Sequence, residues 1–233
     1  MLRFLMFKNK KQAEEIVGTL SKPSKMPGFA YSTPAKRCLI GQKMRNVVGS
    51  MCAFCYALKG RYVFPNVQKA MEKRFASLTH DLWVDAMTYL IGKVKNPYFR
   101  WHDSGDLQGV WHIEKIVKIA KNLPHISFWL PTREYAFVST YIERGGEVPS
   151  NLTIRLSALM MDGPAPIGIA QRLGLCVSGA SKLGNFNCPS SKQGNKCGDC
   201  RKCWDKNEFA IDYKSIKMYR CSSQLFLYAY ATS

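Results

Sequence analysis

The sequence predicts an α/β fold in which parallel βαβ units form a partial or complete barrel, with a cysteine-rich metal-binding segment near the C-terminus. Between residues 98 and 158, short apolar runs typical of strands alternate with amphipathic runs typical of helices. In addition, 46% of the 233 residues are hydrophobic, which suits one sizeable core. We therefore expect an α/β core over residues 1–183, with a cysteine-rich segment and a final strand over 184–233 packed on it.

The individual elements follow from local patterns. Strands are predicted at 98–102, 126–130 and 152–158, with helices between them at about 113–120 and 136–143. Apolar residues also recur at three- and four-residue steps from 67 to 90, which predicts one helix with Asn66 as its N-cap. A short helix is expected near 12–20, a strand at 47–50 and a last strand at 225–230. Strands that alternate with helices in this way imply parallel pairing.

The chain is strongly basic. Lys and Arg outnumber Asp and Glu by 34 to 16, which gives a formal net charge of +18. Such an excess favours anionic partners, including nucleic acid, acidic proteins and phosphorylated metabolites. The basic residues are scattered, however, and metal-bound thiolates would cancel several of their charges. Nucleic-acid binding is therefore a secondary hypothesis. Charged residues amount to 21%, near the globular average, which argues against extensive disorder.

The redox state of the nine cysteines depends on the cellular compartment of the protein. The apolar run at 4–7 is too short for a signal-peptide core, and no stretch approaches the roughly 20 apolar residues of a membrane span. We therefore predict a cytoplasmic protein without a membrane partner, whose thiols stay reduced. An odd cysteine count in that compartment indicates metal ligands and buried thiols instead of disulfides. Cys176 and Cys221 have no close cysteine partner, and we expect them to be small buried residues.

Four cysteines lie within sixteen residues of a polar segment, at Cys188, Cys197, Cys200 and Cys203. Gaps of two residues let neighbouring thiolates reach one metal centre, and three cysteines at such gaps are typical of 4Fe–4S ligation. Four thiolates also make a closed tetrahedral zinc site, so zinc is the alternative metal. The segment has no apolar period of its own, and a bound metal would supply the missing cohesion.

A second set consists of Cys38, Cys52 and Cys55, and Cys52 follows the strand predicted at 47–50. A cluster in the loop after the first strand of a barrel is the layout of radical S-adenosylmethionine enzymes, in which three cysteines leave one iron open. The spacing here differs from the Cys-x3-Cys-x2-Cys signature of that superfamily, so the comparison concerns layout alone. Two arrangements stay open. The three cysteines hold their own cluster, or Cys52 and Cys55 share one centre with the later segment.

Polar residues lie at the ends of three predicted strands, the third of which ends in Arg155, Leu156 and Ser157. His102, Asp103 and Asp106 come after the first, and Arg133 and Glu134 come after the second. Because sites in parallel α/β proteins form at the carboxyl ends of strands, we expect these side chains to converge on a small-molecule substrate. An arginine would bind a carboxylate or phosphate, and a histidine or aspartate would move a proton. The structural alternative is that Asp103 caps a helix and that Arg133 and Glu134 form an ion pair.

At these motifs the chain resembles the uncharacterised bacteriophage gene product 88-like family. The resemblance covers about residues 30–215, and the matching blocks are 45–62, 99–107, 129–134, 151–155 and 188–205. It implies a phage source and action in the cytoplasm of the infected bacterium. A viral iron–sulfur protein of this kind resembles candidates for sulfur chemistry, such as desulfidase-type cleavage of the C–S bond of cysteine. The expected function is thus an iron–sulfur enzyme of this type or a radical S-adenosylmethionine-like one. The alternative is a zinc-stabilised, basic nucleic-acid- or protein-binding factor.

Overall fold

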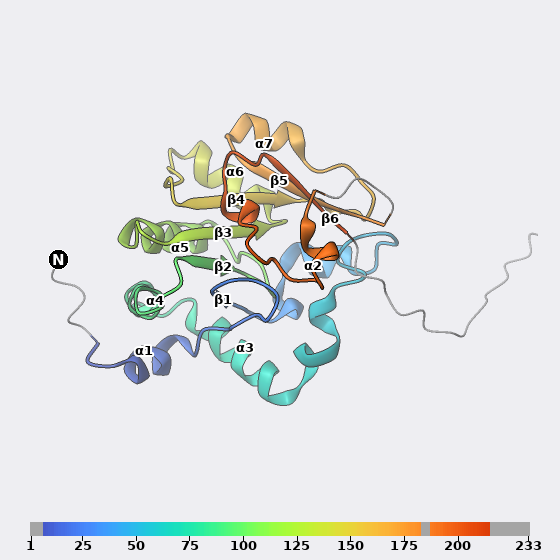
Figure 1. Cartoon of the computed structure of the whole chain (residues 1–233). Helices are drawn as coiled ribbons and strands as arrows, with labels where there is room; N and C mark the ends of the chain where they lie inside the picture. Colours follow the sequence, from blue (N-terminus) through green and yellow to red (C-terminus); the bar gives the residue numbers. More distant parts are fainter. Residues whose placement is uncertain (1–6, 183–186, 215–233) are drawn as a thin grey trace, which may run out of the picture.

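A six-stranded sheet, parallel throughout, forms the centre of the protein (Figure 1). The structure is a computed structural model that describes residues 7–182 and 187–214. The strands follow one another across the sheet in chain order, so that β1 and β6 form its edges. They are β1 (Phe29–Tyr31), β2 (Tyr98–Trp101), β3 (Ser127–Thr132), β4 (Leu152–Ser157), β5 (Cys176–Ser181) and β6 (Ala210–Lys214).

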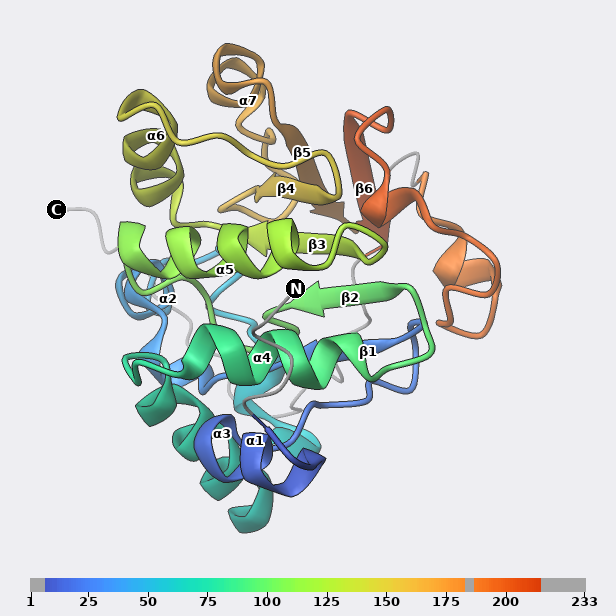
Figure 2. The ribbon, with the colours of Figure 1, turned by 90° about the vertical axis from the view of Figure 1, so that its left-hand side faces the viewer.

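Helices connect most successive strands and cover one face of the sheet. Figure 2 shows α4 and α5 in front of the sheet on this side, running roughly along the strands. The helices are α1 (Lys10–Val17), α2 (Leu39–Met44), α3 (Pro65–Ser77), α4 (Trp83–Gly92), α5 (Val110–Asn122), α6 (Tyr135–Glu143) and α7 (Ile167–Leu173). The connection from β1 to β2 holds α2, α3 and α4, and each of the next three connections holds one helix. The connection from β5 to β6 contains the cysteine-rich segment in place of such a helix.

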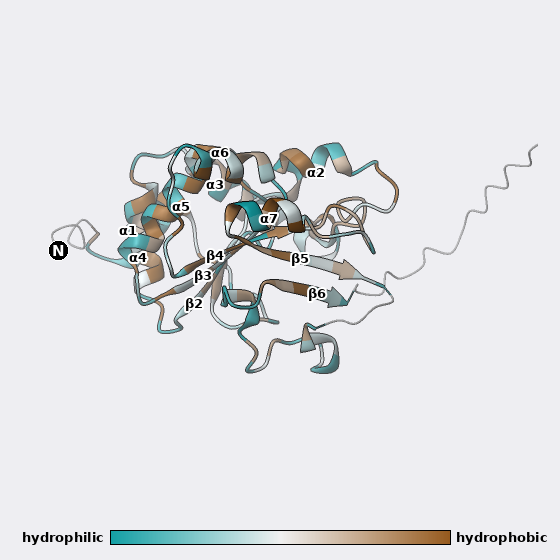
Figure 3. Ribbon diagram, turned by 90° about the horizontal axis from the view of Figure 1, so that it is seen from above, coloured by the Kyte–Doolittle hydropathy of each residue, from teal (hydrophilic) through white to brown (hydrophobic). Residues whose placement is uncertain are grey.

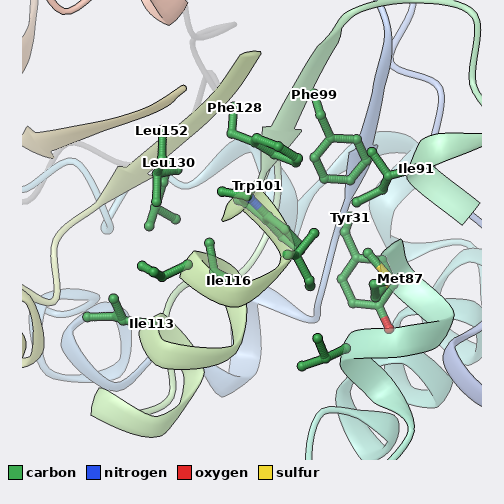
Figure 4. Close-up of a cluster of buried hydrophobic side chains, with 14 of the residues drawn as sticks. Tyr31, Met87, Ile91, Phe99, Trp101, Ile113, Ile116, Phe128, Leu130 and Leu152 are labelled. Atoms are coloured by element: carbon green, nitrogen blue, oxygen red, sulfur yellow. The ribbon is translucent and has the colours of Figure 1, made fainter. Parts of the chain in front are cut away.

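The main core lies between the sheet and these helices (Figure 4). Phe99 and Trp101 of β2 and Phe128 of β3 pack there against Ile91 of α4 and Ile116 of α5. The stacked rings of Trp101 and Phe128 have centroids 6.2 Å apart. Since side chains alternate along a strand, Tyr98 and Arg100 of β2 face the opposite side of the sheet.

The cysteine-rich segment covers that opposite side, as the view from above shows (Figure 3). The Trp204 ring lies 5.3 Å from the Trp129 ring and 5.4 Å from the Tyr98 ring, between centroids. The indole of Trp204 also donates a hydrogen bond to the Phe99 carbonyl, at 2.9 Å. The segment therefore lies over β2 and β3, although it joins the chain next to β6.

Arg155 of β4 holds the same segment against the sheet through hydrogen bonds. Its side chain is fully buried and donates its shorter hydrogen bonds to four backbone carbonyls of the segment, with a longer one of 3.4 Å to the Phe209 carbonyl. The acceptors are Lys202 at 2.7 Å, Cys203 at 3.1 Å, Asp205 at 2.7 Å and Glu208 at 2.7 Å. A buried guanidinium is stable only when its donors are satisfied, so these carbonyls fix the segment on the sheet.

The prediction of an α/β fold with parallel strands is confirmed. The strands expected at 98–102, 126–130 and 152–158 correspond to β2, β3 and β4, and the helices between them to α5 and α6. The helix expected near 12–20 corresponds to α1. A complete barrel is not formed by the described residues, because β1 and β6 remain unpaired edges.

Two of the predicted elements are wrong. The apolar period at 67–90 belongs to two helices, α3 and α4, and α3 begins at Pro65 with Phe64 as its N-cap instead of Asn66. Residues 47–49 form a bend and turn, with Val48 91% exposed, and Ser50 makes only an isolated antiparallel bridge with Met160. The first strand is Phe29–Tyr31 instead, and β5, β6 and α7 were not predicted. The strand expected at 225–230 and Cys221 lie outside the described residues.

Within 7–182 and 187–214, none of the helices has both the length and the apolar character needed to cross a membrane.

Candidate functional site

Three cysteine thiols come together in the connection after β1. Burial raises the pKa of Cys38, and nearby Asp106, Cys55 and Cys52 raise it further because each adds negative charge. Burial also raises the pKa of Cys52, and Cys55 adds to the effect. The raised pKa values keep these thiols protonated at pH 7, so they would become thiolate ligands only beside a positive charge such as a metal.

Backbone contacts place this group at the carboxyl ends of the strands. The Glu134 carboxylate, just after β3, accepts a hydrogen bond of 2.7 Å from the backbone N–H of Ile40, in α2 next to Cys38. On the other side of the group, Met51 N–H donates to the Leu159 carbonyl after β4, at 2.8 Å. The backbone next to Cys38 is therefore held at the end of β3, and the backbone next to Cys52 is held at the end of β4.

Asp106 connects the ends of β2 and β3. Its carboxylate accepts hydrogen bonds from the Thr132 hydroxyl at 2.6 Å, from Leu107 N–H at 2.8 Å and from Arg133 N–H at 3.0 Å. Burial raises the pKa of Asp106, and these hydrogen bonds oppose the rise. This carboxylate is thus largely engaged in holding the loops that present Arg133 and Glu134.

Arg133 and Glu134 do not form an ion pair with each other within the described ranges. Arg133 Nε donates to the Ala158 carbonyl at 3.0 Å, and its charge lowers the pKa of Cys52 against the effect of burial. Burial raises the pKa of Glu134. The structure therefore places both residues beside the three-cysteine group, and their convergence on a substrate stays a prediction.

Asp103 is the centre of a hydroxyl network beside Cys55. Its carboxylate accepts hydrogen bonds from Ser32 and from Tyr62, the latter at 2.9 Å, and its carbonyl accepts one from Tyr56. The rings of Tyr56 and Tyr62 pack edge to face, with centroids 5.6 Å apart. The network connects the residues after Cys55 to the end of β2. Asp103 therefore takes part in this tertiary contact and is not the helix cap of the structural alternative.

His102 points elsewhere. It has a left-handed backbone, with φ 54°, and its ring contacts Trp101 and the His112 ring of α5. The side chain is 3% exposed, and burial together with the charge of Arg100 lowers the pKa of His102 to about 3. The ring of His102 therefore contacts residues on the helix side of the sheet, in contrast to the other four polar residues expected at the strand ends.

The second cysteine group lies on the opposite face of the sheet from the helices. Burial raises the pKa of Cys197, and Cys188 and Cys200 raise it further. Cys203 is the most buried of the four, with its thiol 3.3 Å from the Tyr213 hydroxyl, and burial raises its pKa to about 11. The four thiols therefore form a group of their own, separate from Cys38, Cys52 and Cys55.

The remaining described cysteine, Cys176, is buried, as expected, and its thiol contacts the Lys206 carbonyl at 3.5 Å.

Two arginines at the site were missed in the sequence. Arg45 lies near Cys52 and lowers its pKa, and Arg100 lowers the pKa of Cys197 and Cys203. The Nε atoms of both arginines are buried, and they have no hydrogen-bond partner in the described part of the chain. The strand alternation that places Phe99 and Trp101 in the core was a signal that Arg100 faces the other side.

Both cysteine groups offer the donor set of an iron–sulfur cluster. Among residues 7–182 and 187–214, no three His, Cys, Asp or Glu side chains are arranged to hold a single metal ion. In a 4Fe–4S cluster, by contrast, each thiolate binds a different iron, so its ligands surround a larger centre than those of one ion. Each group gathers several thiols, which are the donors that such a cluster requires, so the donor set fits a cluster of this kind.

Comparison with known proteins identifies the family. The family model described as Gene product 88 matches residues 3–206, which is most of the chain. The chain therefore belongs to this family of phage gene products. No curated protein and no solved structure matches it.

Proposed function

We propose that this protein is an iron–sulfur enzyme with two 4Fe–4S clusters. Cys38, Cys52 and Cys55 would hold the cluster with one open iron, and the four cysteines of the later segment would hold a closed one. The observation that carries the proposal is the position of the three-cysteine group. It lies in the connection after β1 of a parallel sheet whose six strands follow in chain order.

This layout is similar to that of radical S-adenosylmethionine enzymes, and we propose one-electron chemistry of that type. When bound, the open cluster would supply an electron and an iron that S-adenosylmethionine can coordinate. Two features support a partial barrel as the scaffold. The strands are parallel and sequential, and the helices cover one face alone. The site would then open at the carboxyl ends of the strands, where such scaffolds bind their substrates.

The residues of this chain would prepare the site. Arg133, held through its Nε by the Ala158 carbonyl, keeps positive charge beside Cys52 and is suited to binding the carboxylate of a ligand. The Asp106 carboxylate accepts a hydrogen bond from the backbone N–H of Arg133 and so holds the loop that presents the Arg133 side chain. Glu134 fixes the start of α2 next to Cys38 through Ile40 N–H. Orientation of this kind lowers the barrier for a bound reactant by removing its rotational freedom before reaction.

Metal content tests the proposal directly. Protein purified without oxygen should be brown and contain about eight iron and about eight sulfide per chain, as expected for two cubane clusters. Cys52→Ser should reduce both values to about half. Cys176→Ser is the matched control, because this buried thiol belongs to neither group, and it should leave the iron content unchanged. A colourless protein that contains zinc would sink the proposal and favour the zinc-stabilised binding factor.

Reactivity separates two kinds of iron chemistry. S-Adenosylmethionine should change the electron paramagnetic resonance spectrum of the dithionite-reduced protein, and this change should be absent in Cys52→Ser. If S-adenosylmethionine has no effect while the protein releases sulfide from cysteine, the open iron acts as a Lewis acid in C–S cleavage instead.

A further inference from the structure

The connection after β1 has a positive surface. Residues 32–71 contain seven Lys and Arg and no Asp or Glu, whereas the whole chain has 16 acidic residues against 34 basic ones. Six of the seven basic side chains are exposed. Arg37 pairs with Glu72 at 3.3 Å, and the other six have no ion pair within the described chain. The Asp103 and Glu134 carboxylates, which contact the connection, are buried. The charge that this surface presents to solvent is therefore positive.

The same connection exposes apolar side chains. Among the described residues, nine large apolar side chains are exposed, and six of them lie in residues 39–64. They are Leu39, Val47, Val48, Tyr56, Val63 and Phe64. Exposed apolar residues that are concentrated in one part of a protein indicate a contact site, whereas single scattered ones do not. Apolar groups together with positive charge fit a partner that has both negative charge and flat apolar groups.

Aromatic and basic side chains alternate within nine residues of this connection. The exposed members are Tyr56, Lys59, Arg61 and Phe64. Phe64 is 53% exposed and Tyr56 is 50% exposed. On surfaces that bind single-stranded nucleic acid, aromatic rings stack on the bases while Lys and Arg contact the phosphates. Residues 56–64 thus provide both kinds of group that a single strand requires.

Hydroxyl contacts hold these side chains next to the three-cysteine group. Tyr56 follows Cys55 in the chain, and its hydroxyl donates a hydrogen bond to the carbonyl of Asp103 at the end of β2. The Tyr62 hydroxyl donates to the carboxylate of the same residue at 2.9 Å. The helical turn that contains Lys36 contacts the turn that begins at Tyr56. A nucleic-acid strand bound at these side chains would therefore pass beside the three thiols.

We propose that residues 56–64 form a binding surface for single-stranded nucleic acid, in which Phe64 and Tyr56 stack on bases and the basic side chains contact phosphates. The surface itself requires no iron. Under the proposed function, on which this further step rests, the substrate of the three-cysteine site is a nucleotide within a strand. Few phosphate contacts fit along nine residues, so the affinity is moderate and decreases with salt.

Two alternatives make different demands on these residues. A duplex hides the faces of its bases, so it should bind more weakly than a single strand of the same length. An anionic membrane would use aliphatic side chains such as Val48 as readily as aromatic rings, and it would not require the two kinds of side chain to alternate. The alternation therefore favours a single strand over both.

Fluorescence anisotropy with labelled oligothymidylate and oligouridylate, at low and at rising salt, tests the surface and distinguishes DNA from RNA. Phe64→Ala should weaken binding about tenfold, because it removes the stacking of one base. Phe209→Ala is the matched control, since this phenylalanine is also exposed, at 37%, and lies outside the connection, so the affinity should stay as in the wild type.

A second pair of variants tests the charges. Lys59→Gln with Arg61→Gln should reduce the slope of log affinity against log salt by ~1.4, because two phosphate contacts are lost. Lys118→Gln with Arg144→Gln is the matched control. It removes the same charge from exposed positions in α5 and just after α6, and the slope should change little.

The outcomes separate this inference from the proposed function. Equal losses in the two charge variants, an unchanged affinity in Phe64→Ala, or equally tight binding of a duplex would overturn the surface. So would phosphatidylglycerol vesicles that bind the wild type and not Phe64→Ala while nucleic-acid affinity stays the same, since the surface would then serve a membrane. Iron-loaded protein that binds neither oligonucleotide would overturn this inference alone. Iron-free protein that binds them through Phe64 would overturn the enzyme and the substrate assignment, and the surface would stand.

Discussion

The rings of His102 and His112 lie edge to face in the interior, with centroids 5.2 Å apart. Both side chains are buried, and none of their four ring nitrogens has a hydrogen-bond partner in the described residues. Burial lowers the pKa of His102 to about 3 and that of His112 well below the ordinary 6.5. The pair is therefore neutral in the folded protein at pH 7.

This pair should make stability depend on pH. Imidazoles of the unfolded chain take up protons below about pH 6.5, whereas those of the folded protein stay neutral. The pair therefore has no effect on stability above pH 6.5, and it lowers the stability of the folded protein progressively as the pH falls from 6.5 towards 3. We expect the free energy of unfolding to decrease by ~1.4 kcal/mol per pH unit for each histidine.

Urea unfolding at pH 4.5 to 7.5 measures this slope. His112→Phe should remove about half of the dependence that comes from the pair. His125→Gln changes an exposed histidine and should leave the slope as in the wild type. An unchanged slope in His112→Phe would show that the acid sensitivity has another origin.

Arg155→Met should destabilise the fold and release the cysteine-rich segment. It removes the buried donors of four carbonyls, at a cost of ~3–5 kcal/mol. Thermal unfolding and limited proteolysis at 187–209 would report the change. Arg172→Met is the control, since this side chain is 66% exposed and its ion pair with Glu143 is 3.8 Å long, so its effect should stay within ~0.5 kcal/mol. Equal melting of the two variants would contradict the role of Arg155.

The two cysteine groups should respond differently to substitution. Cys197→Ser or Cys200→Ser should lose metal and lower the melting temperature, because little apolar packing holds this exposed part of the segment. Cys55→Ser should abolish activity and leave much of the fold intact, since backbone and hydroxyl contacts hold its surroundings. Metal analysis and calorimetry check both. Full metal content and unchanged melting in Cys197→Ser would refute the ligand assignment.

Nucleic-acid binding should be weak at physiological salt. The net charge of +18 attracts DNA or RNA through phosphate contacts, and such binding falls steeply with salt because counterions are released. Fluorescence anisotropy from low to physiological salt would measure this. Tight binding that persists at physiological salt would favour the nucleic-acid-binding factor over the enzyme.

The sequence predicted the middle of the sheet well and its edges poorly. In β2, β3 and β4 the apolar runs are flanked by amphipathic helices, so two periodicities reinforce each other. In contrast, β1 has three residues after Pro27 and Gly28, which is too short for any period to be recognised. The apolar Val47 and Val48 resembled a strand, but they are 40% and 91% exposed in a turn. Their position was decided by the attachment of the loop to Leu159 and not by hydrophobicity.

The candidate site shows a similar division. Gaps of two residues allowed the sequence to group Cys52 with Cys55, and Cys200 with Cys197 and Cys203, because short gaps restrict the chain locally. The approach of Cys38 and Cys188 to these thiols depends on the fold. The effect of Arg100 on the pKa of Cys203 depends instead on the docking of the cysteine-rich segment, more than 100 residues away in sequence. His102 was expected to face the substrate, but its left-handed backbone and its contact with His112 depend on how α5 packs. Neither relationship leaves a local pattern in the sequence.

The anchoring of the cysteine-rich segment has an evolutionary consequence. Arg155 recognises this segment through main-chain oxygens, which every amino acid carries. The side chains at Asp205, Lys206 and Asn207 are exposed. Substitution of these side chains should therefore leave the hydrogen bonds of Arg155, and with them the position of the thiols, unchanged. The amino-acid sequence of the segment's outer surface and the position of its thiols can thus vary independently of each other.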